Sequence, residues 1–151
     1  RGRSEAKPVH REALEELAGS LRIRQGLVVL VIDDDPVTVE LVRAAATDVD
    51  ASVTVEGALG GWEGLVKCGA VQPGLLFLDV MMPGIDGLEV ARRLPSIEGL
   101  ADLRIVFVTS SRNPDVLARA AALGTEVLPK PLELDELARV MGEALEPASQ
   151  R

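Results

Sequence analysis

Aromatic residues are scarce in this chain of 151 residues, which has no Tyr, one Trp and two Phe. Its core must therefore be built from Leu, Val, Ile and Ala. Cysteine is almost missing as well: Cys68 stands alone, which excludes an internal disulfide and fits a reducing compartment. We expect Cys68 to be a small core-facing residue late in a helix.

Long apolar runs and an excess of positive charge are also missing. The longest apolar run, residues 27–32, is too short to span a bilayer, and no signal-peptide pattern precedes it. The chain has 16 Lys and Arg against 24 Asp and Glu, a net charge of −8. This balance argues against nucleic acid or an anionic membrane as a direct partner. We expect a cytoplasmic protein.

Apolar segments with the character of strands alternate with segments that have helical periodicity. Such alternation predicts an α/β fold with a parallel sheet covered on both faces. Three strands are apolar throughout and two are marginal, which fits a flavodoxin-like, doubly wound, five-stranded sheet in the order 2-1-3-4-5 with the marginal strands at its edges. The predicted strands are residues 27–32, 52–56, 75–79, 103–108 and 127–128, and the predicted helices are residues 36–47, 60–69, 87–94, 114–123 and 133–145.

The chain is predicted to have three parts. Residues 1–26 are interpreted as a linker with an extra amphipathic N-terminal helix at 9–21, residues 27–146 as one domain, and residues 147–151 as a C-terminal tail. The basic, amphipathic start and the lack of an initial Met lead us to expect a preceding domain in the same protein.

Helical spacing also predicts which side chains face the core. The residues expected to point inward are Val37, Leu41, Ala44 and Ala45 in the first helix of the domain, Trp62 and Leu65 in the second, and Leu134, Leu137, Ala138, Met141 and Leu145 in the last.

The strongest functional signal lies in residues 75–87. Four apolar residues end at Asp79, and a loop with Pro83 and Gly84 follows that cannot continue a strand. This pattern places Asp79 at the carboxyl end of a buried strand, on the edge where open α/β sheets bind their ligands.

Other polar residues follow the remaining strands in the same way. Asp33 and Asp34 come after the first strand, Thr109 after the fourth and Lys130 after the fifth. Because the carboxyl ends of parallel strands share one edge of a sheet, we expect these residues to converge with Asp79 on a single pocket.

The expected cluster has the chemistry of a phosphoryl-transfer site. Crowded carboxylates raise one another's pKa unless a cation neutralises them, and Mg²⁺ prefers such oxygen ligands. An ammonium and a hydroxyl can then bind the oxygens of a phosphoryl group while a carboxylate attacks it.

Residues 27–146 resemble the receiver domains of response regulators, on the strength of the acidic pair, the segment around Asp79, the hydroxyl and the lysine. The resemblance implies that Asp79 is the phosphoacceptor, that Thr109 is the switch hydroxyl, and that Lys130 precedes a cis Pro131. It also implies Mg²⁺ held by Asp34, Asp79 and the backbone carbonyl of Met81, with Asp33 acting mainly through metal-bound water.

The implied function is to accept a phosphoryl group from a histidine kinase or histidine phosphotransfer protein and then to change the surface near the last two helices. Such a protein is not a conventional enzyme: it catalyses its own aspartyl phosphorylation and slow dephosphorylation.

Two features depart from the family pattern. Val127 stands where the family usually has Tyr or Phe, and the loop after Gly124 looks one residue shorter, so the aromatic readout is in doubt. Met81 and Ser111 occupy positions that tune acyl-phosphate hydrolysis in this family, and neither has a carboxylate or amide side chain.

Two alternatives stay open. One is a receiver-like interaction module that is not regulated by phosphate, which Val127 favours. The other, less favoured, is a phosphatase of the haloacid dehalogenase type, in which Asp33 would be the nucleophile and Asp35 the acid/base. That family has a further acidic pair beyond its lysine, which this sequence lacks.

Overall fold

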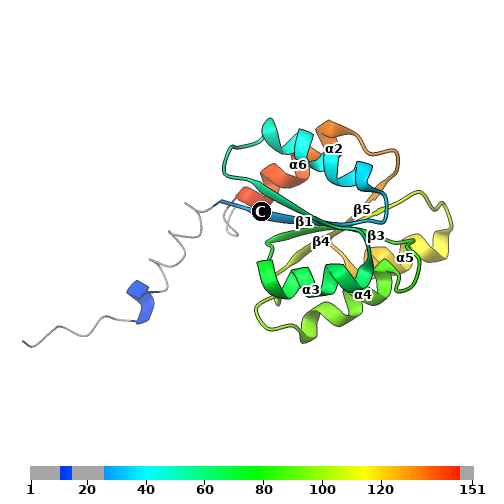
Figure 1. Cartoon of the computed structure of the whole chain (residues 1–151), viewed down its shortest axis with the longest axis horizontal. Helices are drawn as coiled ribbons and strands as arrows, with labels where there is room; N and C mark the ends of the chain where they lie inside the picture. The colour runs from blue at the N-terminus through cyan, green and yellow to red at the C-terminus, as the bar shows by residue number, and fades with distance from the viewer. Residues whose placement is uncertain (1–10, 15–25, 147–151) are drawn as a thin grey trace, which may run out of the picture.

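The computed structural model describes residues 11–14 and 26–146. The strands form one parallel sheet in the order β2-β1-β3-β4-β5, which confirms the flavodoxin-like prediction (Figure 1). The strands are β1 (Val28–Ile32), β2 (Thr54–Ala58), β3 (Leu75–Asp79), β4 (Arg104–Thr109) and β5 (Glu126–Pro129). The helices are α2 (Pro36–Thr47), α3 (Gly61–Val71), α4 (Gly87–Arg93), α5 (Pro114–Leu123) and α6 (Leu134–Leu145), with a 3-10 turn at Leu94–Ser96.

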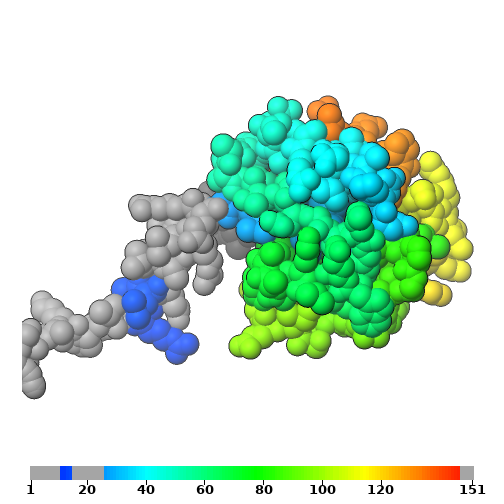
Figure 2. Space-filling view, in the orientation of Figure 1, coloured from blue at the N-terminus to red at the C-terminus, as the bar shows by residue number. Residues whose placement is uncertain are grey.

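Helices cover both faces of this sheet. α2 and α6 pack on one face over Val29, Val31 and Phe77, whereas α3, α4 and α5 lie on the other (Figure 1). In the space-filling view the helices and loops hide most of the sheet (Figure 2). β3 is buried along its whole length, which explains why its sequence is apolar without alternation.

Residues 11–14 are helical, as predicted for the N-terminal extension. The rest of the predicted helix at 9–21, and the tail at 147–151, lie outside the described residues. Among the described helices, none combines the length and apolar character needed to cross a bilayer.

The second strand begins and ends two residues later than predicted. β2 pairs with β1 from Thr54 to Ala58, whereas the alternating pattern had indicated residues 52–56. The pattern fades after Glu56 because Gly57 and Ala58 are small, and Gly57 is where Val39 of α2 packs against the strand: an added Cβ would lie 2.8 Å from Val39 Cγ2.

Trp62 of α3 does not point inward as predicted. Trp62 is 58% exposed, and the guanidinium carbon of Arg93 lies over its ring, 5.0 Å from the ring centre. The buried positions are instead Gly61, Gly64 and Cys68, because the helix lies so close to the sheet that a Cβ on Gly64 would be 2.4 Å from Ile32 Cδ1. The glycines that weaken the helical pattern are therefore what lets the helix pack, while Leu65 is half-buried and Cys68 is buried as expected.

The other helices follow the predictions more closely. Val37 and Ala44 of α2 and Leu134 of α6 are exposed, contrary to expectation. Val37 and Ala44 lie next to the buried face of α2, whereas Leu134 is the first residue of α6, before its buried residues begin. The side chains that do face the core are Thr38, Val39, Val42, Ala45 and Ala46 in α2, and Leu137, Val140 and Met141 in α6, while Leu41, Ala138 and Leu145 are half-buried.

A matched pair of glycine substitutions on α3 tests this packing. We expect Gly64→Ala to lower the free energy of unfolding by about 1–3 kcal/mol, because the new methyl group overpacks against Ile32. Gly69→Ala should raise it by about 0.5–1 kcal/mol, because Gly69 is exposed and its nearest neighbour would be 4.0 Å away, so only helix propensity changes. Urea unfolding measures both, and equal effects of the two substitutions would contradict the close approach of α3.

Candidate functional site

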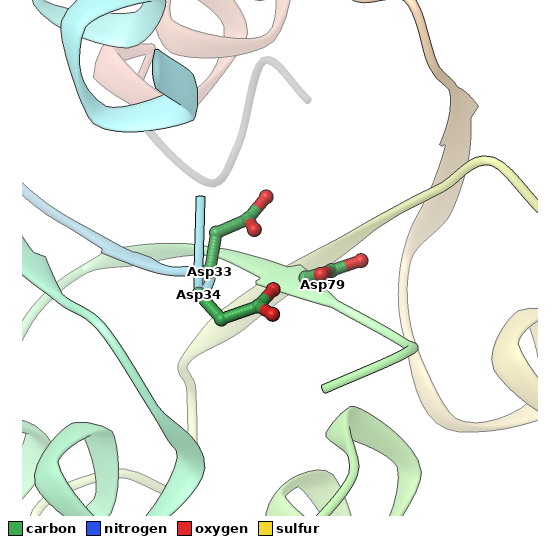
Figure 3. Close-up of side chains that lie close together, drawn as sticks. All are labelled: Asp33, Asp34 and Asp79. Carbon is green, nitrogen blue, oxygen red and sulfur yellow. The ribbon is translucent and has the colours of Figure 1, made fainter. Parts of the chain in front are cut away.

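Three carboxylates gather at the carboxyl ends of β1 and β3 (Figure 3). Asp33, Asp34 and Asp79 each offer an oxygen within 4.8 Å of the other two. Asp33 and Asp79 are buried, with 0% and 4% of their surface exposed, whereas Asp34 is exposed. The strand pairing explains this proximity, because Ile32 pairs with Leu78 and the next residue in each chain segment is the aspartate.

Asp33 is held by three hydrogen-bond donors. Its Oδ2 accepts from Thr38 Oγ1 at 2.6 Å and from Lys130 Nζ at 2.8 Å, and its Oδ1 accepts from the Asp35 amide at 2.9 Å. Burial alone would raise the pKa of Asp33, but the hydrogen bonds from Lys130, Thr38 and Asp35 together hold it below its ordinary value. Asp33 is therefore a fixed anion.

Asp79 is less well neutralised. Its Oδ1 lies 3.5 Å from Lys130 Nζ. Burial, followed by the charge of Asp33, raises the pKa of Asp79 to about 7, and the charge of Lys130 only partly opposes this rise. Asp33 and Asp79 together carry more negative charge than the half-buried ammonium of Lys130 can balance.

Lys130 links the two buried carboxylates. Burial alone would lower its pKa, but the hydrogen bond to Asp33 and the charge of Asp79 raise the pKa above the ordinary value for a lysine, so the side chain is charged. Its backbone amide donates to the Thr109 carbonyl at 2.8 Å, which ties the end of β5 to the end of β4. The peptide bond from Lys130 to Pro131 is cis, as expected.

Thr109 is the last residue of β4, next to Asp79 at the same edge of the sheet. Its side chain is buried, and its hydroxyl oxygen accepts a hydrogen bond from the Ser111 amide at 3.0 Å. Met81 lies in the loop after β3 with its side chain exposed. The predicted residues thus share one edge, and direct contacts join Asp33, Asp79 and Lys130.

Oxygen donors of this kind fit a hard divalent cation. Two carboxylates and a carbonyl suffice for Mg²⁺, which keeps several waters, and the excess negative charge around Asp79 is what such a cation would offset. Asp34 has no hydrogen bond or ion pair within the part of the chain that the structure describes, so its carboxylate is available as a ligand.

One residue of the site, Thr38, was missed by the sequence reasoning. It lies on the buried face of α2 and donates to Asp33. The signal was present in the sequence as a single hydroxyl among the apolar residues on that face.

A cavity of about 440 Å³ adjoins the site on the side of α5 and β5. Thr109 and Lys130 line its inner end, and Leu117, Ala121 and Val127 line its apolar wall. Val127 is thus one of the residues that form the wall of this cavity.

Comparison with known proteins agrees with the geometry. A family model described as response regulator receiver domain matches residues 29–141. The chain is 40% identical over 112 residues to the response regulator MprA of Mycobacterium ulcerans (strain Agy99), covering 72% of this chain and 46% of that protein. It is 33% identical over 114 residues to the DNA-binding dual master transcriptional regulator RpaA of Synechocystis sp. (strain ATCC 27184 / PCC 6803 / Kazusa), covering 74% of this chain and 46% of that protein. The chain thus spans about half the length of these relatives.

Solved structures show the same fold. A putative response regulator from Chloroflexus aurantiacus J-10-fl superimposes with a TM-score of 0.70 and 26% identity, covering 80% of this chain and 98% of that one. The signal receiver domain of a DNA-binding response regulator from Colwellia psychrerythraea 34H gives a TM-score of 0.72 at 22% identity, covering 80% and 99%. The family model spans most of the chain, and the sheet order and the acidic cluster of this structure agree with that match. This chain therefore belongs to the response regulator receiver domain family.

Proposed function

We propose that Asp79 accepts a phosphoryl group from a histidine kinase or histidine phosphotransfer protein in a Mg²⁺-dependent reaction. The observation that carries the proposal is a carboxylate only 4% exposed, placed between a fixed anion and a charged lysine at the edge of the sheet. A surface aspartate with a purely structural role would not need a second buried carboxylate beside it.

Each residue has a distinct role in this reaction. A carboxylate oxygen of Asp79 attacks the phosphorus, and the donor leaves with the electron pair of its bond to phosphorus. Lys130 binds an oxygen of the transferred group as an ammonium, and the Thr109 hydroxyl donates to another. The Thr109 hydroxyl oxygen accepts a hydrogen bond from the Ser111 amide, so its own hydrogen can donate to the phosphoryl group without breaking that contact.

The metal ligands we propose are Asp34, Asp79 and the backbone carbonyl of Met81. When bound, Mg²⁺ would neutralise the negative charge of the phosphoryl oxygens. Asp33 would act on the metal through water and not as a direct ligand, because its Oδ2 already accepts two hydrogen bonds, while the Asp34 carboxylate has no partner among the described residues.

We also propose the setting in which this domain acts. Residues 27–146 form the receiver domain, residues 1–26 lead to it from a further domain, and the protein works in the cytoplasm. One relative is named as DNA-binding, and this chain covers 46% of it. The net charge of −8 favours placing any such contact outside this domain.

The two alternatives fare differently. A phosphatase of the haloacid dehalogenase type would need Asp33 as an accessible nucleophile, but Asp33 is fully buried and three donors occupy its oxygens. A module not regulated by phosphate is favoured by one observation, Val127, because it stands where the family usually has an aromatic ring that moves with the switch hydroxyl.

Phosphorylation by a small donor separates these functions. Incubation with Mg²⁺ and acetyl phosphate should add the mass of one phosphoryl group to the wild-type protein, and Asp79→Asn should abolish the gain because the attacking carboxylate is removed. Intact-protein mass spectrometry measures the gain. Asp86→Asn is the matched control: Asp86 is exposed and caps α4, and Asn can also cap a helix, so this variant should be phosphorylated like the wild type.

A chelator such as EDTA should prevent the gain in the wild type. Modification that persists in Asp79→Asn but is lost in Asp33→Asn would support the phosphatase alternative. No gain in any variant, with the protein folded, would support the module that is not regulated by phosphate.

The phosphorylated form should be long-lived. We expect the phosphoryl group on Asp79 to persist for minutes or longer, because Met81 and Ser111 offer no carboxylate or amide to orient an attacking water. Met81→Asn should shorten the half-life severalfold, since Met81 is exposed beside the site and the new amide can hold a water there. Val66→Asn, at an exposed apolar position on α3, is the control. A wild-type half-life of only seconds would show this reasoning to be wrong.

A further inference from the structure

Thr38 is a buried hydroxyl on an otherwise apolar helix face. It is 4% exposed, and the other buried residues of α2 are Val39, Val42, Ala45 and Ala46. Valine has nearly the same shape and would fill the same space without a polar atom to desolvate. What threonine adds at this position is therefore the hydrogen bond that its hydroxyl donates to Asp33.

That hydrogen bond is short and ends on a crowded oxygen. Thr38 Oγ1 lies 2.6 Å from Asp33 Oδ2, the same oxygen that accepts from Lys130 Nζ at 2.8 Å. With the Asp35 amide on Oδ1, the carboxylate is held from the helix, from the loop after β5 and from the turn after β1. Hydrogen bonds to a charged group are among the stronger ones in proteins, so this arrangement fixes the orientation of Asp33.

The two donors on Oδ2 are not equivalent. Lys130 is a flexible side chain placed closer to Asp33 than to Asp79, at 2.8 Å against 3.5 Å. An ammonium that shifts toward a phosphoryl group on Asp79 would move away from Asp33. Thr38 is carried by the first turn of α2, whose N-terminus is capped by Asp35, so it stays in place as a donor when Lys130 moves.

We infer that Thr38 is a positioning residue for the metal and phosphoacceptor site: it holds the Asp33 carboxylate in a fixed orientation and frees Lys130 to follow the phosphoryl group. The inference rests on the proposed function and adds to it a residue outside the acidic cluster, the hydroxyl and the lysine. Thr38 acts through Asp33, as an outer-shell partner of a metal site does.

Two substitutions separate the hydroxyl from the methyl group of Thr38. Thr38→Val keeps the shape and removes the donor, whereas Thr38→Ser keeps the donor and loses a buried methyl. Removing an outer-shell partner typically weakens metal binding about 10- to 100-fold, so Thr38→Val should raise the Mg²⁺ Kd about tenfold or more, and Thr38→Ser should stay close to the wild type. Isothermal titration calorimetry with Mg²⁺ alone measures this without any phosphodonor.

The rate of phosphorylation by acetyl phosphate should follow the same order, with the Ser variant near the wild type and the Val variant slower even at saturating Mg²⁺. The midpoints of thermal unfolding in EDTA should not follow this order of variants, because the Ser variant loses packing and should melt at a lower temperature than the wild type. Thr47→Val is the matched control: Thr47 lies on the exposed end of α2, where its hydroxyl donates to the Ala44 carbonyl, and its loss should leave the Mg²⁺ Kd unchanged.

A Thr38→Val protein with the Mg²⁺ Kd and the phosphorylation rate of the wild type would overturn the inference. So would equal weakening by Val and Ser, since that pattern indicates a packing role. The Ser variant alone keeps the test decisive if the Val variant does not fold, because weakened Mg²⁺ binding with the hydroxyl retained contradicts the inference. A wild-type protein that neither binds Mg²⁺ nor gains a phosphoryl group would instead refute the proposed function.

Discussion

The structure depends on one electrostatic constraint, two buried carboxylates that face a single ammonium. Asp33 and Asp79 end neighbouring parallel strands whose register, Ile32 opposite Leu78, leaves them side by side. Like charges this close destabilise one another in a poorly hydrated site, and Lys130 can fully satisfy only one of them. The ammonium lies closer to Asp33, so the charge of Asp79 is left partly uncompensated. A cation or a covalent modification of Asp79 would reduce this repulsion.

The buried sheet and the helices packed on it hold these charged side chains in place. The central strand β3 is buried along its whole length, and α3 lies close enough to β1 that Gly64 packs directly against Ile32. The loops that follow the strands therefore hold their polar side chains on a fixed support. Thr109 and Lys130 belong both to this edge and to the wall of the cavity against α5 and β5. The site and α5 thus share one cavity wall, although Val127 supplies no aromatic ring.

The sequence was sufficient to predict the architecture and the members of the acidic cluster. Continuous apolar runs identify buried parallel strands, and the topology alone brings their polar end residues to one edge, so the positions of Asp33, Asp79 and Lys130 follow without knowledge of side-chain detail. Trp62 was placed wrongly because periodicity treats a large apolar residue as inward, whereas α3 approaches the sheet most closely at Gly64, where a Cβ would already clash with Ile32. Thr38 was missed because its role lies in a single contact across the start of α2, and no pattern of spacing reveals a contact of that kind.

The central claim is that Asp34, Asp79 and the Met81 carbonyl enclose one site for a divalent cation. The most direct test is a crystal structure of the protein soaked with Mn²⁺, which prefers the same oxygen ligands as Mg²⁺ and can be located by its anomalous scattering. The account predicts a single strong peak in contact with the Asp34 and Asp79 carboxylates and the Met81 carbonyl, with Asp33 reached through water. A peak held without Asp79, or no peak at this edge of the sheet, would contradict it.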